Sequence, residues 1–334
     1  MRPLCERPLP QRGRRFTDGI MLPIFLNTLP FFALIALGYA AGRTRFFTEE
    51  ATAYLTRFVF YFALSAMLFR FSANLSVSEV FDWAFVLAYL WGSMLIYLLA
   101  TAVGLVRRLK IEEIAVEAQC AVIGNVGFLG IPMLVLLLGE PAIGPVMMVL
   151  AIDLIIFGSL IVILITGSRD GRMSLGILRT VGMGLLKNPM IVSIALGLLW
   201  ATTGLAVPAP AEEFLQILGS AATPGALFAI GASLATKSAN KLAVTGYLSF
   251  LKLVAHPLAV AVAALVIFPV EPYAAGVMIA AAALPVAGNV FILAQHYNVA
   301  PTRVSASILI STAVSVITVS LVIGWVSSFA LVGG

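Results

Sequence analysis

Long apolar stretches, separated by short polar connections, run along the whole chain. They predict ten membrane-spanning helices, because about 20 apolar residues suffice to cross the hydrocarbon core. Away from the span ends, only four charged residues interrupt these stretches: Arg57, Glu117, Asp153 and Lys252. The pattern indicates an all-α, multi-pass integral membrane protein. The predicted spans are 22–42, 50–70, 82–106, 113–139, 143–167, 188–207, 213–236, 242–269, 272–296 and 302–330.

Composition supports this class and excludes others. Of the 334 residues, 61% are hydrophobic and 10% are charged, whereas about a quarter are charged in an ordinary soluble domain. This excludes a soluble enzyme, a nucleic-acid binder and a disordered chain. Ten spans use nearly the whole chain, so we expect residues 21–334 to form a single transmembrane domain. Two isolated cysteines and two isolated histidines predict neither a disulfide nor a metal site, and we expect no cofactor.

The distribution of Lys and Arg predicts the orientation. The connections that follow odd-numbered spans contain twelve of these residues, whereas the other connections and the C-terminus contain only Arg70. The positive-inside rule then places the protein in the cell (inner) membrane with the odd connections in the cytoplasm and both termini on the outer side.

The N-terminal tail, residues 1–20, disagrees with this orientation because it carries five arginines. Three interpretations remain open. The tail is a short translocated segment, an artefact of an upstream start site with Met21 as the true first residue, or the basic start of a signal peptide. The last interpretation would remove one span, which conflicts with the internal symmetry of the chain.

That symmetry is a repeat of five spans. Spans one and six begin 166 residues apart, and the triplets Gly124–Val126 and Gly288–Val290, both Gly-Asn-Val, lie 164 residues apart. Five is an odd number, so the second half crosses the membrane in the opposite sense, as in an inverted repeat. Pro132 and Pro285 lie close to the triplets, and each proline removes a backbone donor from its span. Spans four and nine are therefore predicted to be broken helices.

Two broken helices that meet near the middle of the bilayer can form a binding site. Their freed backbone groups must line a polar cavity, because lipid cannot satisfy them. The N-termini of the half-helices offer N–H groups and a positive dipole end, which suit a carboxylate. The alternative is two ordinary proline kinks whose asparagines bond to the backbone. The residues predicted to bind substrate are Asn125, Gly130, Pro132, Pro285, Asn289 and Gln119.

The chain over residues 21–330 resembles the auxin efflux carrier family, which includes bacterial carriers for malonate and other carboxylates. The resemblance implies the fold of the bile-acid and sodium/proton transporter relatives, with spans four and nine crossing. It also implies an elevator motion, a homodimer and contact between Asn125 and the substrate carboxylate. The long central loop of the plant members is missing, so auxin itself is not the expected substrate. The matching stretches are 125–132 (NVGFLGIP), 223–234 (beginning TPG), Lys252 with Pro257, 283–285 (ALP) and 291–298 (FILAQHYN).

The same resemblance implies two structural parts. Residues 22–70 and 188–236 would form a scaffold. Residues 82–167 and 242–330 would form a moving transport domain.

Three ionisable residues inside the spans require an explanation, because burying a charge in the bilayer is costly. Asp153, midway along span five, is either a coupling site for a proton or cation or a structural partner in the bundle. Lys252 and His256 share one face of span eight. Three roles are open for Lys252: to attract an anion, to pair with Asp153, or to extend to the membrane edge. A single histidine on an apolar face, such as His256, is more often a hydrogen-bonding residue than a group that switches charge near neutral pH. Glu117 and Arg57 are expected to be interfacial or paired charges.

The leading hypothesis is a secondary transporter that moves a small organic anion, a mono- or dicarboxylate, and that contacts only substrate, lipid and a second copy of itself. One alternative is a cation/proton antiporter on the same fold, although the predicted crossing carries asparagines rather than carboxylates. Another is a membrane sensor that binds a ligand without transporting it. No nucleophile–base pair or metal cluster at mid-span suggests an enzyme.

Overall fold

The computed structural model describes residues 21–75, 82–170, 175–235 and 242–330. Within these ranges every regular element is a helix, apart from one isolated β-bridge. The elements of the first half are α1 (Met21–Arg43), α2 (Glu49–Phe58), η1 (Val59–Ala63), α3 (Leu64–Ala73), α5 (Trp83–Val106), α6 (Ile111–Val122), η2 (Val126–Gly130), α7 (Ile131–Leu138), η3 (Glu140–Ala142), α8 (Ile143–Ile152), η4 (Asp153–Phe157) and α9 (Gly158–Asp170). Those of the second half are α10 (Leu175–Lys187), α11 (Pro189–Ala201), α12 (Ala209–Ser220), α13 (Ala222–Leu234), α14 (Leu242–Phe250), η5 (Leu251–Ala255), α15 (His256–Val262), η6 (Ala263–Ile267), α16 (Pro272–Ala282), α17 (Gly288–His296) and α18 (Pro301–Ala330).

The described residues contain six continuous helical segments that are long and apolar enough to cross a membrane, and a bent pair of helices makes a seventh candidate. The prediction of an all-helical, multi-pass membrane protein is confirmed in this form. Predicted spans one, four and nine are not among the continuous segments. Span one is represented by the shorter apolar helix Thr28–Arg43, and the helices of spans four and nine are interrupted at residues 123–125 and 283–287. The N-terminal tail lies outside the described residues.

The connection between the two halves contains a helix that the sequence analysis missed. The predicted spans leave residues 168–187 as a connection, but α10 occupies most of it and meets α11 at a bend of 72°. Asn188 forms the corner, where its Oδ1 accepts hydrogen bonds from the N–H groups of Met190 (3.0 Å) and Ile191 (3.4 Å). Pro189 then starts α11 in the first-turn position that tolerates a missing N–H.

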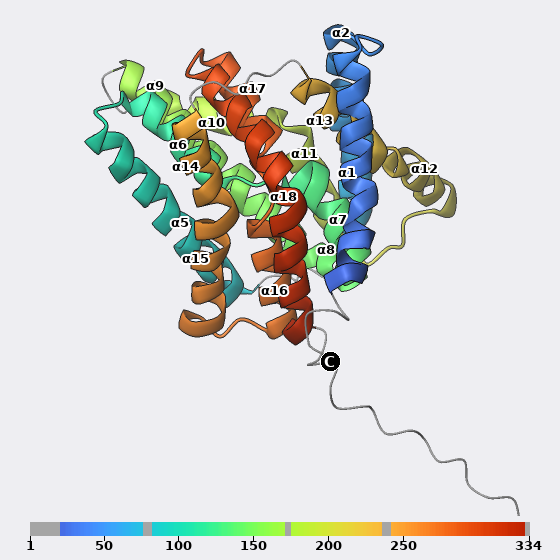
Figure 1. The fold of residues 1–334 in the computed structure, drawn as a ribbon. Coiled ribbons are helices and arrows are strands. Elements are labelled where there is room, and N and C mark those ends of the chain that lie inside the picture. The colour runs from blue at the N-terminus through green and yellow to red at the C-terminus, as the bar shows by residue number, and fades with distance from the viewer. Residues whose placement is uncertain (1–20, 76–81, 171–174, 236–241, 331–334) are drawn as a thin grey trace, which may run out of the picture.

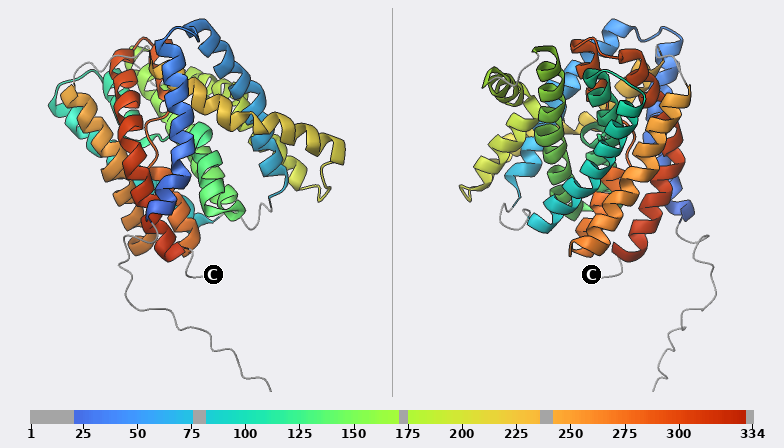
Figure 2. Two further views of the ribbon diagram at one scale, coloured as in Figure 1. Left: turned by 45° about the vertical axis from the view of Figure 1, so that its right-hand side comes forward. Right: turned by 90° about the vertical axis from the view of Figure 1, so that its left-hand side faces the viewer.

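The helices pack in two groups. In one group α1 packs along α13, and α3 packs against α11 and α12. A Cβ atom at Gly231 of α13 would lie 1.9 Å from the carbonyl oxygen of Ile35 in α1, so only glycine permits this close approach. In the other group α5 packs on α6 and α15, and α16 packs on α18. Figures 1 and 2 show α12 leaning away from the rest of the bundle.

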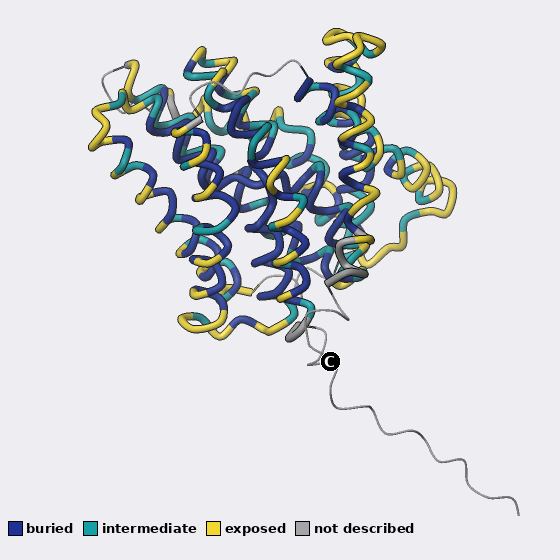
Figure 3. Tube along the Cα trace, in the orientation of Figure 1, coloured by how far each residue is buried: buried dark blue, intermediate teal, exposed yellow. Residues whose placement is uncertain are grey.

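The start of α1 and the end of α18 lie at the same lower end of the bundle in Figure 1. Buried positions run through the middle of the bundle, where the interrupted helices meet, whereas exposed positions follow α12 and the outer edges of α1 and α5 (Figure 3). The outward-facing apolar side chains are those expected to contact lipid in a membrane protein. The buried middle is therefore the place to look for a site.

Several helices contain one wider, π-helical turn. The turns η4 and η5 contain Asp153 and Lys252, two of the four charges that the sequence places inside spans. A π-helical turn leaves backbone groups out of the regular ladder and is frequent at functional sites. These turns direct attention to the region between α8, α15 and the two helix breaks.

Candidate functional site

The two helix breaks lie against each other and pair through their backbones. Gly124 and Val286 form an isolated antiparallel bridge. The N–H of Asn125 donates to the carbonyl of Pro285 (2.9 Å), and the N–H of Ala287 donates to the carbonyl of Ile123 (3.1 Å). Each break therefore satisfies backbone groups that the other break has freed, as a membrane interior requires.

Local hydrogen bonds stabilise the backbone at each of the two helix breaks. Asn125 has φ −76° and ψ 53°, close to the values of an inverse γ-turn, and the N–H of Val126 donates to the carbonyl of Gly124 (2.8 Å). At the second break, Ser311 of α18 accepts a hydrogen bond from the N–H of Val286 (3.1 Å). A local turn thus shapes the first break, and α18 holds the second break from the side.

A small cavity of about 60 Å³ adjoins the paired breaks, which is room for a few water molecules. Asn289 and Gly288 of the first turn of α17 line it, and so does Asn125. A Cβ atom at Gly288 would meet nothing within 4 Å, so this glycine leaves space in the cavity. The full lining is Phe60, Ile123, Gly124, Asn125, Gly127, Phe128, Leu150, Asp153, Leu154, Asn188, Met190, Ala287, Gly288 and Asn289.

Three oxygen atoms of this lining lack a hydrogen-bond partner: Oδ1 of Asn125, Oδ2 of Asp153 and Oδ1 of Asn289. Asn125 and Asp153 are only 5% and 3% exposed. The two asparagines are the residues that the repeat offset singles out, and the structure places both beside one cavity. Buried polar atoms are almost always paired, so three unpaired atoms around one cavity indicate a place where something binds.

Asp153 is held from behind by Tyr89 of α5, whose hydroxyl donates to Oδ1 (2.8 Å). The other oxygen of the same carboxylate remains open. Tyr89 also packs edge-on against the ring of His256, at 6.0 Å between ring centres. The hydroxyl therefore fixes the orientation of a carboxylate that presents its second oxygen to the cavity lining.

Lys252 lies behind the crossing and is fully buried. Its ammonium group donates to the carbonyl of Ala282, at the broken end of α16, where a positive charge complements the helix dipole. The same group lies 3.0 Å from Nδ1 of His256, and Nε2 of His256 lies 2.9 Å from Oγ of Ser93. An ammonium group only donates, so Nδ1 accepts and Nε2–H donates to the serine. Lys252 and His256 thus form a buried polar chain outside the cavity lining.

The remaining predicted binding residues do not line the cavity. The carbonyl of Pro285 pairs with the other break, and a Cβ atom at Gly130 would lie 2.6 Å from Leu284, so this glycine permits close packing. Pro132 lies in the first turn of α7. Gln119 is buried in α6, and its Oε1 lacks a partner.

Sequence reasoning missed Tyr89, Ser93 and Asn188. The signal for the first two was a stripe of polar side chains four positions apart along this span, which continues with Tyr97 and Thr101.

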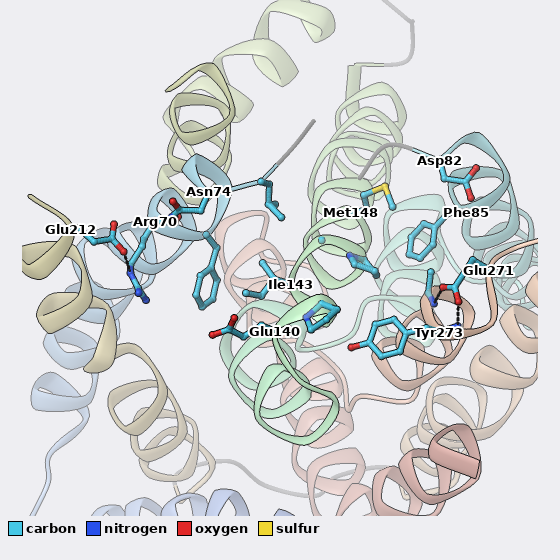
Figure 4. A pocket seen from close by; sticks show the side chains of 16 residues that line it. Arg70, Asn74, Asp82, Phe85, Glu140, Ile143, Met148, Glu212, Glu271 and Tyr273 are labelled. Atoms are coloured by element: carbon cyan, nitrogen blue, oxygen red, sulfur yellow. Dashed lines mark hydrogen bonds and ion pairs between the residues drawn. The ribbon is translucent and has the colours of Figure 1, made fainter. Parts of the chain in front are cut away.

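A larger cavity of about 750 Å³, which we call the vestibule, lies at one end of the bundle between α3 and α12 on one side and α5, α8 and α16 on the other (Figure 4). Arg70 and Glu212 form an ion pair at its edge. Glu271 caps α16 by accepting from the N–H groups of Tyr273 (2.9 Å) and Ala274 (2.7 Å). Among the described residues that line the vestibule, Arg70 is the only basic one, against the acids Asp82, Glu140, Glu212 and Glu271.

At the opposite end, Glu117 is almost fully buried between two arginines. It accepts from Arg107, the residue directly after α5 (2.6 Å), and from Arg303 of α18, and Arg303 also contacts Glu113 (3.3 Å). The prediction that Glu117 is a paired charge is confirmed. Within the described ranges, no group of three or more His, Cys, Asp or Glu residues is arranged to hold a metal ion.

Comparison with known proteins identifies the family. The family described as "Membrane transport protein" matches residues 23–323. The chain belongs to this family of membrane transporters. Because its relatives are transporters rather than enzymes, the chain is not an enzyme. The resemblance to the auxin efflux carriers, seen first in the motifs around Asn125 and Pro285, is confirmed.

Individual relatives of this transporter align along almost their whole length. A protein of Rhizobium meliloti (strain 1021), named "Putative malonate transporter", is 31% identical over 310 residues, which cover 91% of this chain and 96% of the relative. The "Uncharacterized transporter YfdV" of Escherichia coli (strain K12) is 26% identical over 311 residues, with 90% and 97% covered. The "Uncharacterized transporter MJ1031" of Methanocaldococcus jannaschii is 23% identical over 304 residues, with 88% and 95% covered.

Proposed function

We propose that this protein is a secondary transporter that binds a small organic anion, a mono- or dicarboxylate, at the crossing of the two broken helices. The observation that carries the proposal is the cavity beside the paired breaks, which is lined by Asn125, Asn289 and the first turn of α17. The name of the Rhizobium meliloti relative points to the same chemical class of substrate.

The chemistry of the crossing suits a carboxylate. The first N–H groups of a helix have no partner within the helix, and α17 begins in the cavity lining with Gly288. An asparagine amide can also offer its NH₂ group to an anion when the side chain rotates. Two amides and one helix N-terminus thus supply donors and a positive dipole end at one place.

We also propose that ten spans form a five-plus-five inverted repeat with a scaffold (22–70 and 188–236) and a transport domain (82–167 and 242–330). The two groups of packed helices support this division, and the cavity lies between them. Phe60, Asn188 and Met190 line it from the scaffold, whereas Asp153 and Asn289 line it from the transport domain. A sliding motion of one part against the other would then carry the substrate across, as in an elevator. A homodimer of scaffolds is part of the same proposal.

We propose that the end of the bundle that holds the vestibule faces outward from the inner membrane. Arg70 is the one basic residue in the even connections of the chain, and the vestibule is lined by this residue and by the ends of α3, α5, α8 and α16. The opposite end carries the basic residues Arg107 and Arg303, which the positive-inside rule places in the cytoplasm. Both chain ends would then lie outside.

The test is uptake of labelled mono- and dicarboxylates, malonate included, into proteoliposomes. The parent protein should be compared with Asn125→Ala and Asn289→Ala. The matched control is Gln295→Ala, which removes an exposed amide from the same helix, α17. We expect saturable uptake of at least one acid, a fall of about tenfold or more in either asparagine variant, and little change in the control.

The other outcomes are equally informative. If a correctly folded protein takes up none of the acids, the proposal of a carboxylate substrate is wrong. Uptake that survives both asparagine substitutions would instead place the substrate site away from the crossing.

A further inference from the structure

The helix α10 is too short to cross a membrane by itself. Its 13 residues extend over roughly 20 Å at 1.5 Å per residue, whereas the hydrocarbon core is about 30 Å thick. Figure 1 shows α10 in the upper part of the bundle, away from the start of α1 and the end of α18. In the proposed topology α11 runs across the bilayer, so the bend of 72° between the two helices lays α10 along the cytoplasmic membrane surface.

The exposed side of α10 carries two adjacent rows of side chains. Residues four positions apart share one face of a helix, and one row contains Leu178 and Leu186, which are 62% and 72% exposed. The next row contains Arg179, Met183 and Lys187, all of them exposed. Among the described residues the ion pairs use other cations. The helix therefore presents apolar side chains and positive charge side by side.

We propose that α10 lies in the cytoplasmic interface of the membrane and binds an anionic phospholipid. The headgroup phosphate would contact Arg179 and Lys187, and the acyl chains would pack against Leu178 and Leu186. Short helices with apolar and basic side chains lie in the interface plane, and attraction to anionic lipids strengthens their binding. The connection that contains α10 also carries four of the twelve Lys and Arg residues of the odd connections.

Charge favours lipid over a second copy of the chain as the partner of this surface. Two copies that met symmetrically through α10 would bring Arg179 and Lys187 of each against the same residues of the other, because such an interface uses one surface twice. Like charges placed opposite each other repel. An anionic headgroup instead complements both residues, and the membrane already surrounds a helix at this position.

The corner between α10 and α11 connects this surface to the cavity at the crossing. Asn188 and Met190 line that cavity, and Asn188 joins the two helices by accepting from the N–H groups of Met190 and Ile191. A Cβ atom at Gly127 would lie 2.6 Å from Cε of Met190, so Met190 packs directly against the first break. On the proposed function, lipid that fixes α10 also fixes one wall of the substrate cavity, and uptake then depends on anionic lipid.

The first test measures lipid binding without any organic substrate. Thermal unfolding of the purified protein in neutral detergent is followed while phosphatidylglycerol is added, with zwitterionic phosphatidylcholine as the comparison. We expect a saturable rise of about 3–5 °C with phosphatidylglycerol only, and salt should reduce it. Arg179→Gln/Lys187→Gln should lose the rise, whereas Arg179→Lys should keep it. The matched control, Arg45→Gln/Arg108→Gln, removes two exposed charges from other odd connections and should also keep it.

A fluorescent probe tests the position of the helix independently of stability. Bimane attached to Leu186→Cys in a cysteine-free background is exposed to brominated lipids in proteoliposomes. Quenching should be stronger with brominated phosphatidylglycerol than with brominated phosphatidylcholine. In Arg179→Gln/Lys187→Gln the two lipids should quench equally.

Three results would overturn the lipid site: equal rises with both lipids, a rise that survives Arg179→Gln/Lys187→Gln or is lost equally in the control, or a probe that neither lipid quenches. The link to the cavity is tested by uptake in vesicles with and without phosphatidylglycerol, which should differ by about fivefold or more in the parent and not in the double variant. Equal uptake in the parent would remove that link. A protein that binds phosphatidylglycerol but takes up no acid would contradict the proposed function and leave the lipid site standing.

Discussion

At the scale of single residues, the site depends on how each buried polar group finds a partner. Asn125 and Asn289 were found from sequence because they occupy equivalent positions of the repeat. The role of Tyr89 became visible only in the folded chain, where it donates to Asp153 across 64 residues of sequence. Side chains that are so far apart leave no local pattern.

The space beside Gly288 provides a test of the cavity itself. Gly288→Ala adds one methyl group where nothing lies within 4 Å, so the protein should fold with a change in stability of less than about 0.5 kcal/mol. Because the methyl group occupies the cavity, carboxylate uptake should fall about tenfold or more. The control Gly246→Ala, at an exposed position of α14 that is also open, should leave uptake unchanged. Unaltered uptake in Gly288→Ala would argue against the cavity as the binding place.

Tyr89→Phe tests the support of Asp153. The substitution leaves Oδ1 of the buried carboxylate without its donor, which costs about 1–3 kcal/mol of stability. The midpoint of thermal unfolding in detergent should fall accordingly. Tyr61→Phe, at an exposed tyrosine of η1, should leave it within error. Equal midpoints for the two variants would mean that the hydrogen bond between Tyr89 and Asp153 does not hold the carboxylate.

At the scale of elements, the breaks are the decisive feature. Prolines and glycines in spans four and nine predicted that these spans are not continuous helices, and Pro285 lies within the second break, where it removes a backbone donor. Pro132 lies after the first break, in the first turn of α7, so span four breaks at Gly124 and Asn125 rather than at its proline. The pairing of Gly124 with Val286 could not be predicted in register, because it depends on how two distant helices cross. The helix α10 was missed because it is short and lies in a basic connection that resembled a loop.

The carboxylate of Glu117 joins α5, α6 and α18 and gives a prediction at this scale. Glu117→Gln leaves Arg107 and Arg303 without their shared partner. Breaking a buried ion pair costs about 3–5 kcal/mol, so the variant should unfold at a clearly lower temperature. Glu112→Gln breaks the more exposed pair with Arg169 and should cost about 0–1 kcal/mol. If both variants unfold at the same temperature, the buried pair does not hold these helices together.

At the scale of the whole molecule, most charged residues lie towards two opposite ends of the bundle, with Asp153 and Lys252 buried between them, and apolar side chains cover the circumference. The lower end in Figure 1 holds the start of α1 and the end of α18. This arrangement fits an even number of crossings, and the bias of Lys and Arg gives the direction. The orientation is therefore open to a direct measurement.

Single cysteines in a cysteine-free background test the orientation. Ala209→Cys, at the exposed start of α12, should react with a membrane-impermeant maleimide on intact cells, because the even connections are predicted to lie outside. Lys110→Cys, in an odd connection, should react only after permeabilisation. Both positions are exposed, so failure to label would not reflect burial. The reverse pattern would invert the topology and place the vestibule in the cytoplasm.

The sequence by itself determined the class of the protein, its all-helical multi-pass character, the two breaks and the two asparagines. These follow from composition and from short-range pattern, because lipid requires apolar length and because the two Gly-Asn-Val triplets, each with a proline nearby, occur at equivalent positions of the repeat. Only the tertiary structure decided that the breaks pair, that Asp153 lies beside both asparagines, and that Lys252 caps the end of α16. Those contacts join residues far apart in the chain, and their geometry is fixed by the crossing of packed helices.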